Sequence, residues 1–244
     1  MMKTININKK IGGVLFAGLI MLSSCNDYLT TLPTDSLVSD GAISTPEDTK
    51  TALNGAYAGL ISARTDGDTY YYYGMDFLAR AEVGGDDTQT NKIGDRTENY
   101  YRFTYRQNNA PQDLWYTPYA VINRVNVLLN AIDNGDVPMT DVVKNSKGEA
   151  LAHFNLLITY GTPYLKDNGA SLGVPVVKKV LTATDLPGRS TVAEGYQAVL
   201  DDLSDALGLI NEEKNYGHFN RWAVKALLAR VNLYKGDYDA AYSY

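Results

Sequence analysis

The 244-residue chain has few of the residues that disulfides and metal sites require. It contains one cysteine, which excludes an intramolecular disulfide framework and a cysteine-based zinc or iron–sulfur centre. Its two histidines, His153 and His218, are too far apart in the sequence to suggest a histidine metal site. Acidic residues outnumber basic ones by 28 to 22, which argues against nucleic acid as the main partner. We therefore expect no metal, no cofactor and no nucleic-acid ligand.

The N-terminal apolar run is too short to span a membrane. Residues 11–22 are apolar, whereas a spanning helix takes roughly 20 residues. Three lysines precede the run, and Leu22-Ser23-Ser24-Cys25 follows it and contains the only cysteine. This pattern resembles a bacterial lipobox, which predicts that residues 1–24 are a signal peptide and that Cys25 is lipidated. The alternative is an ordinary secretory signal with a chance cysteine.

The residues after Cys25 suggest how the chain is attached to a membrane. Residues 25–44 are polar and contain Pro33, so we interpret them as a tether, followed by a helical domain over 45–244. An acidic chain is repelled by an anionic membrane surface, so attachment would depend on the lipid. Asn26 follows the cysteine, in place of the aspartate that retains some lipoproteins at the inner membrane. That observation permits placement in the outer membrane.

Apolar residues recur at helical spacing along most of the chain, which predicts an all-α fold class. Thr45-Pro46, Thr191 with Glu194, and Asn220 are signals for helix N-termini. Only Gly173–Val177, within an extended stretch over 169–187, looks like a strand. The expected helices span residues 45–61, 70–82, 110–133, 146–160, 191–210, 221–235 and 239–244.

Tyrosine is the unusual abundance, with 19 residues against five phenylalanines. A run of four tyrosines at 70–73 and a pair at 100–101 flank a polar stretch, 84–109, that we expect to be irregular. Tyrosine offers apolar area with a polar tip, which suits the binding of sugars. The alternative is that the rings pack and the acids are solvated turn residues. The predicted ligand-binding residues are Tyr71, Tyr73, Asp86, Asp87, Asn91, Arg96, Tyr100 and Tyr101.

Two further expectations concern side-chain packing in the helices. Trp115 is expected to pack between helices rather than to serve as a sugar platform. Leu157 and Ile158 are both expected to face inward from the helix over 146–160.

No catalytic pattern is visible. The neighbouring acids Asp201 and Asp202 point to different sides of a helix, so they do not form a glycosidase pair. The sequence shows no Ser/His/Asp spacing and no phosphate-binding glycine loop. We therefore predict that the protein is not an enzyme.

The C-terminal residues resemble one tetratricopeptide helical pair. Ala229 and Ala241 match the small residues where two such helices cross, and Gly236 matches the turn. Tyr238 matches the aromatic residue that packs beneath the turn. One repeat is weak evidence for a regular array.

A set of motifs in a fixed order resembles the N-terminal half of SusD/RagB-type proteins. The motifs are Cys25–Leu29, the 45–61 helix, Leu114-Trp115-Tyr116, Tyr160–Pro163, Gly173–Val176, Arg189–Val192 and Phe219-Asn220. The resemblance implies a fold of tetratricopeptide-like pairs with long irregular loops. It also implies a surface-exposed outer-membrane lipoprotein that passes an oligosaccharide or peptide to a SusC-like TonB-dependent transporter.

The resemblance also bears on length, because family members are usually about twice as long as this chain. The chain ends inside an expected helix, so we expect a truncated SusD-like fold without its C-terminal half. The alternatives are a tetratricopeptide-type lipoprotein scaffold that binds a protein partner, or a non-functional truncated fragment. A lipid-anchored hydrolase is a more distant choice.

Overall fold

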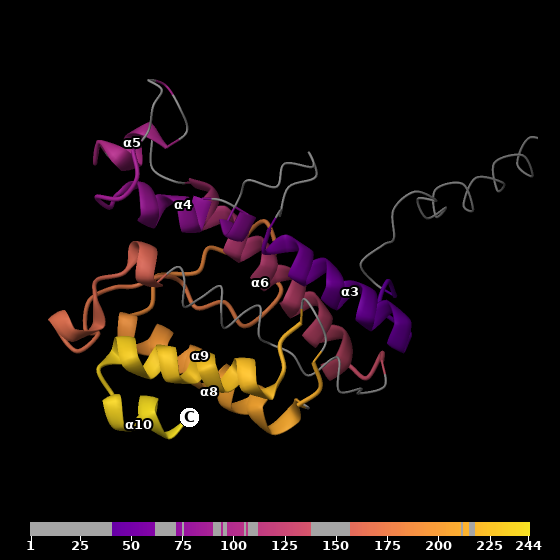
Figure 1. Ribbon diagram of the computed structural model, residues 1–244. Helices are drawn as coiled ribbons and strands as arrows, with labels where there is room; N and C mark the ends of the chain where they lie inside the picture. The colour runs from indigo at the N-terminus through magenta and orange to yellow at the C-terminus, as the bar shows by residue number, and fades with distance from the viewer. Residues whose placement is uncertain are drawn as a thin grey trace, which may run out of the picture. The chain divides into compact units, whose positions relative to one another are not determined.

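The computed structural model describes residues 41–61, 72–74, 76–89, 94, 97–104, 106, 112–137, 157–210, 212–214 and 218–244 (Figure 1). Residues 43–244 form one structural unit. The predicted signal peptide over 1–24, Cys25 and most of the tether lie outside the described residues, as does most of the helix expected over 146–160. Within the described ranges the fold is mainly helical and contains no strand, which confirms the predicted fold class.

The first described helix, α3 (Pro46–Gly59), begins where its capping signal predicts. The Thr45 hydroxyl accepts from the Asp48 backbone N–H at 3.2 Å, and the Asp48 carboxylate accepts from the Thr45 N–H at 2.9 Å. This reciprocal pair satisfies two donors that a helix N-terminus leaves open. These hydrogen bonds, led by the one from the Thr45 side chain, lower the pKa of Asp48 below its usual value.

The prediction of a single helix over 70–82 is wrong. The chain instead forms a 3₁₀ turn, η2 (Tyr72–Gly74), followed by α4 (Asp76–Val83). Tyr72 has φ +49°, a left-handed conformation that cannot continue a right-handed helix. Its ring is almost completely buried, so packing holds this backbone conformation. The prediction that 84–109 is entirely irregular is also wrong, because Glu98–Tyr101 form the short helix α5.

The longest described helix, α6 (Gln112–Asp133), lies against α3 (Figure 1). It continues through Pro118, although that residue has no N–H to donate. The Arg124 guanidinium donates to the Gly55 carbonyl at 2.8 Å and so joins the two helices. Leu53 of α3 and Leu128 and Ile132 of α6 belong to one buried apolar cluster, which the flanking residues Ile43 and Val137 complete.

Between residue 157 and α8 the chain is extended without forming a ladder. Within the described part, the single bridge pairs Leu172 with Thr191, so the strand-like interpretation of 173–177 is wrong. The segment also contains a 3₁₀ turn, η3 (Tyr164–Lys166). Leu157 is buried as predicted, whereas Ile158 is 41% exposed, so the expectation that it faces inward is wrong.

Three consecutive helices complete the unit: α8 (Val192–Leu209), α9 (Arg221–Lys235) and α10 (Tyr238–Ser243). The predicted caps are present, with Thr191 and Glu194 forming a capping box and Asn220 accepting from the Ala223 N–H at 3.0 Å. Helix α9 contacts both α8 and α10 (Figure 1). The largest apolar cluster lies here and includes Val199, Leu203, Val224, Leu227, Leu228 and Val231.

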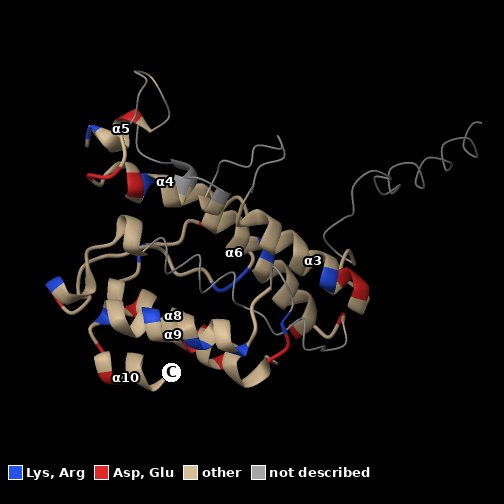
Figure 2. Cartoon of the chain, viewed as in Figure 1, with Lys and Arg blue, Asp and Glu red and all other residues tan. Residues whose placement is uncertain are grey.

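The two helices of this core carry charges of opposite sign. The charged residues of α8 are all acidic and those of α9 are all basic (Figure 2). Because the helices are neighbours, their opposite charges attract, although water and salt screen that attraction. The ion pairs of these helices lead to other segments, from Asp202 to Lys178 and from Arg221 to Glu212, so the apolar contact holds the two helices together.

The turn between α9 and α10 partly matches the tetratricopeptide expectation. Gly236 adopts φ +84°, a conformation that favours glycine, and ends α9. Tyr238 was expected to pack beneath this turn, but it is 63% exposed. Leu165 occupies that space instead. Its Cδ2 is so close to Gly236 that a Cβ atom at position 236 would lie only 2.5 Å from it. Within the described residues, no helix is long and apolar enough to cross a membrane.

Candidate functional site

The three predicted ligand-binding tyrosines that the structure describes are buried or half-buried. The Tyr73 ring is half-buried and lies 4.7 Å from the Tyr72 ring and 5.1 Å from the Phe77 ring, between centroids. Tyr100 is buried, and Tyr101 is half-buried. Tyr101 therefore presents more of its ring to solvent than Tyr100 does.

The predicted acids have a different environment. Asp86 and Asp87 follow α4 and are exposed. Helix α4 contacts α5, so these acids and the pair Tyr100-Tyr101 lie on neighbouring elements. Tyr71, Asn91 and Arg96 lie outside the described residues. Ligand binding by this region stays a prediction.

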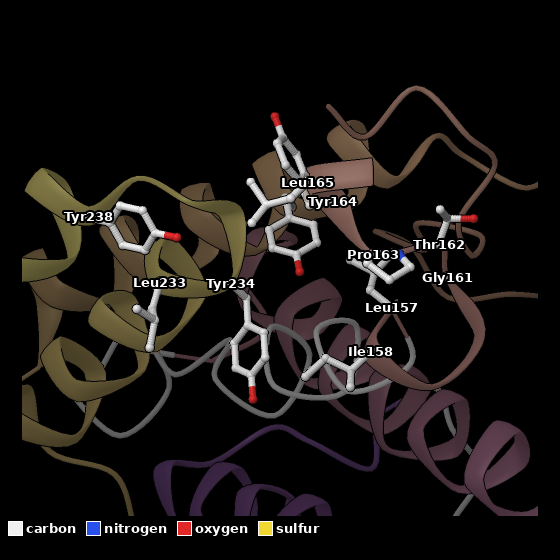
Figure 3. Close-up of a pocket in the computed structure, with 11 residues that line it drawn as sticks. Leu157, Ile158, Gly161, Thr162, Pro163, Tyr164, Leu165, Leu233, Tyr234 and Tyr238 are labelled. Carbon is white, nitrogen blue, oxygen red and sulfur yellow. The ribbon is translucent and has the colours of Figure 1, made fainter. Parts of the chain in front are cut away.

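A tyrosine pocket of about 440 Å³ lies between α9, α10 and the residues around η3. Leu233, Tyr234 and Tyr238 lie across from Pro163 and Leu165 (Figure 3). Tyr196 of α8 also lines the pocket, and its ring meets that of Tyr164 edge to face at 5.0 Å between centroids. Its volume falls in the range of about 300–1,000 Å³ that is typical of small-molecule sites.

The Tyr196 hydroxyl of the tyrosine pocket stays protonated at physiological pH. Burial, together with the nearby Tyr234 and Tyr164, raises the pKa of Tyr196 to about 12. A neutral phenol both donates and accepts a hydrogen bond. The pocket therefore combines apolar rings with neutral polar tips, which suits an uncharged polyhydroxylated ligand.

A second hollow, which we call the Trp115 groove, lies between the start of α6 and the segment 175–187. Two side chains of α6, Tyr119 and Asn126, hold that segment in place without a β-ladder. The Tyr119 hydroxyl donates to the Pro175 carbonyl at 2.9 Å. The buried Asn126 amide donates to the carbonyls of Val177 at 3.2 Å and Lys179 at 2.9 Å.

Burial strengthens this attachment. Desolvation raises the pKa of Tyr119, so its hydroxyl remains a donor at any physiological pH. The Asn123 side-chain oxygen lies 3.5 Å from the Leu181 N–H, which is a long contact. The wall of the groove is thus positioned by side chains more than 50 residues away in the sequence.

Sequence reasoning did not identify either hollow. A signal was present for one wall of the Trp115 groove, because Trp115, Tyr119 and Asn123 are spaced i, i+4, i+8 and share one helix face. The expected packing of Trp115 is partly correct: its ring lies 5.2 Å from those of Tyr119 and Tyr160, yet it remains 37% exposed.

The described residues show no arrangement suited to holding a metal ion. They contain no group of three or more histidine, cysteine, aspartate or glutamate side chains that would hold a metal ion. Both hollows are lined by aliphatic, aromatic and neutral polar side chains. Such surfaces bind ligands through ring contacts and neutral hydrogen bonds.

Comparison with known proteins gives a consistent set of matches. A SusD-like family model, described as "Starch-binding associating with outer membrane", matches residues 28–233. SusD superfamily structures from Bacteroides vulgatus and Bacteroides thetaiotaomicron are each 33% identical, with TM-scores of 0.73 and 0.72. Each match covers 82% of this chain, and 45% and 44% of the respective relative.

A curated relative matches over nearly the whole chain. The SusD-like protein P38 of Formosa agariphila is 25% identical over 241 residues, which is 96% of this chain and 44% of the relative. The chain therefore spans less than half of the length of each relative described above.

Proposed function

Because the chain belongs to the SusD-like family of starch-binding proteins associated with the outer membrane, we propose that it captures a nutrient oligosaccharide at the cell surface. The observation that carries this proposal is the family match over residues 28–233. A peptide is the second ligand class. The captured ligand passes to a SusC-like TonB-dependent outer-membrane transporter.

The mechanism is non-covalent capture followed by release, with no chemistry on the ligand. Sugars lay their C–H faces on aromatic rings and exchange hydrogen bonds with neutral hydroxyls. The tyrosine pocket supplies such groups through Tyr164, Tyr234 and Tyr238. The predicted residues Asp86, Asp87 and Tyr101 would add contacts near α4 and α5.

Membrane attachment is the second part of the proposal. Signal cleavage before Cys25 and lipidation of that cysteine would anchor the chain to the outer membrane, with residues 25–44 as a tether. A Cys25→Ser variant should then move from the membrane fraction to the soluble fraction when cells are lysed and centrifuged. A variant that still partitions with membranes would contradict the anchor.

An alternative function is a scaffold for a protein partner, and one observation favours it. Leu233 and Tyr238 remain more than half exposed on the helical pair α9–α10, where a further helix would bury them. Purification of a protein complex without a SusC-like barrel, together with no glycan binding, would support the scaffold. Recovery of such a barrel would support nutrient uptake.

The proposed function is tested by measuring binding of maltohexaose and of a short peptide library to the purified protein by calorimetry. We expect saturable binding of the oligosaccharide. Tyr238→Ala should weaken it by about 3- to 10-fold, which is the effect of one aromatic contact. Tyr242→Ala is the matched control, because Tyr242 lies on the same helix, is almost fully exposed and does not line the pocket.

Two results would contradict the proposal. If neither the oligosaccharide nor any peptide binds, nutrient capture by this chain is wrong. If binding occurs and the two tyrosine variants behave alike, the tyrosine pocket is not the site of capture.

A further inference from the structure

The Trp115 groove exposes large apolar side chains next to one another. Trp115 is 37% exposed, Tyr116 is 58% exposed and Leu186 on the opposite rim is 92% exposed. The groove has a volume of about 420 Å³, which is within the range of small-ligand sites. Side chains of this size are buried in cores far more often than they line an open hollow.

The aromatic surface of the groove is held in position before any ligand arrives. The Trp115 ring meets the Tyr160 ring at 86° and the Tyr119 ring at 53°, each 5.2 Å away between centroids. Tyr119 is itself held by its hydrogen bond to the Pro175 carbonyl. A ring fixed in this way loses little conformational entropy when a ligand stacks on it.

The opposite wall is equally well ordered. Asn126 binds the carbonyls of Val177 and Lys179, which fixes the start of the segment. Farther along, the Asp185 carboxylate accepts from the Thr182 N–H at 2.7 Å and pairs with the Lys179 ammonium at 3.0 Å. All three charged residues of the segment are paired, Lys179 with Asp185 and Lys178 with Asp202 of α8.

The groove also offers hydrogen-bonding groups that the described part of the chain leaves open. Among the described residues, nothing accepts a hydrogen bond from the Trp115 indole N–H or the Asn123 amide nitrogen, and nothing pairs with the Tyr116 hydroxyl. None of the described side chains that line the groove is charged. The lining therefore favours a neutral ligand, with an apolar face for the rings and hydroxyls for the open polar groups.

A pyranose ring has this combination of properties. We propose that the Trp115 groove is a second saccharide-binding site, in which Trp115 and Tyr116 carry a pyranose face and Asn123 binds its hydroxyls. The inference rests on the proposed function for the nature of the ligand, but it concerns a different part of the molecule. A ligand that spans the groove and another site would bind more tightly than either site alone allows.

The chain contains only two tryptophans, Trp115 and Trp222, so fluorescence isolates the groove. A Trp222→Phe variant retains Trp115 as the only indole. Trp222 lies on α9 beneath the Lys225 ammonium and does not line the groove. Titration of this variant with maltohexaose should give a saturable change in Trp115 emission.

Affinity variants provide the second arm of the test. Trp115→Ala should weaken maltohexaose binding in calorimetry by about 10-fold, and Tyr116→Phe by about 2- to 5-fold. Trp222→Ala is the matched control and should bind as the wild type does. Trp115→Ala also removes contacts with Tyr119 and Tyr160, so it could disturb the structure of the groove. Asn123→Ala changes a solvent-exposed position without this effect and should also weaken binding.

The outcomes separate the two proposals. If the wild type binds maltohexaose but Trp115 emission is constant and all variants bind equally, the groove proposal is wrong while the proposed function stands. If an apolar peptide changes Trp115 emission and the oligosaccharide does not, the groove is not a saccharide site. If no oligosaccharide binds the wild type, nutrient-glycan capture fails and the groove proposal fails with it.

Discussion

The core between α8 and α9 and the Trp115 groove are built from similar apolar side chains but are held together differently. Leu203 and Leu228 are completely buried, so the removal of apolar surface from water stabilises that core. At the groove, Trp115 and Leu186 stay exposed, and hydrogen bonds from Tyr119 and Asn126 position the wall. Apolar side chains that stay exposed contribute little to stability. Because hydrogen bonds fix the surrounding backbone, these side chains are available to a ligand.

The largest effect should come from the core. Leu228→Ala removes a fully buried side chain, and we expect it to lower the free energy of unfolding by about 2–5 kcal/mol. Urea denaturation followed by circular dichroism measures the loss. Leu233→Ala on the same helix is the control, since its half-exposed side chain should matter far less. Equal losses would contradict the contrast between buried and open positions.

Asn126→Ala tests whether hydrogen bonds hold the groove wall. The variant leaves the Val177 and Lys179 carbonyls without their amide donor, which should cost about 2–4 kcal/mol. Hydrogen exchange should rise in 175–187 more than in α8 and α9. Asn130→Ala, at an exposed position of the same helix, should leave exchange unchanged. A uniform rise over the chain would show that the groove and the core are one cooperative unit.

Thr191→Ala removes the N-terminal cap of α8. We expect a loss of about 1 kcal/mol, because the Glu194 N–H loses its hydroxyl acceptor. Thermal denaturation measures it, with Thr191→Ser as the control that keeps the hydroxyl. If serine and alanine destabilise equally, the cap contributes nothing and burial alone positions α8.

The smallest effect concerns the loop at the rim of the groove. Hydrogen bonds from the Thr182 N–H and the Lys179 ammonium lower the pKa of Asp185 from 3.8 to about 2. The ionised carboxylate therefore supports the loop fully above about pH 4, and this support is lost as the pH falls towards 2. An NMR titration of the carboxyl carbon should show a midpoint near 2.

Asp185→Asn should abolish the pH dependence of the loop around residues 182–185 between pH 4 and 2. Asp201→Asn, in α8, is the control and should leave that pH dependence unchanged. The Trp222→Phe variant provides a readout, because Trp115 emission reports the groove. A midpoint near the ordinary value for aspartate would contradict the hydrogen-bonded loop geometry.

The accuracy of the sequence predictions depended on how far apart the interacting residues are. The helix starts at Thr45, Thr191 and Asn220 were predicted because a cap acts over three residues. The helix over 70–82 was wrong because burial of the Tyr72 ring imposes φ +49°, which local propensity does not contain. The exposed position of Tyr238 was missed because Leu165 takes its place beneath Gly236.

The sequence by itself determined the local features of this protein and the motifs that it shares with its family. These are the capped helices, the lipobox-like segment ending in Cys25, and the ordered motifs of a SusD-like chain. Tertiary structure decided which aromatic side chains are buried and which remain exposed to solvent. Residues 115–123 and 175–187 meet only because the extended segment returns across α6, and a contact between residues so distant depends on the path of the whole chain rather than on local spacing.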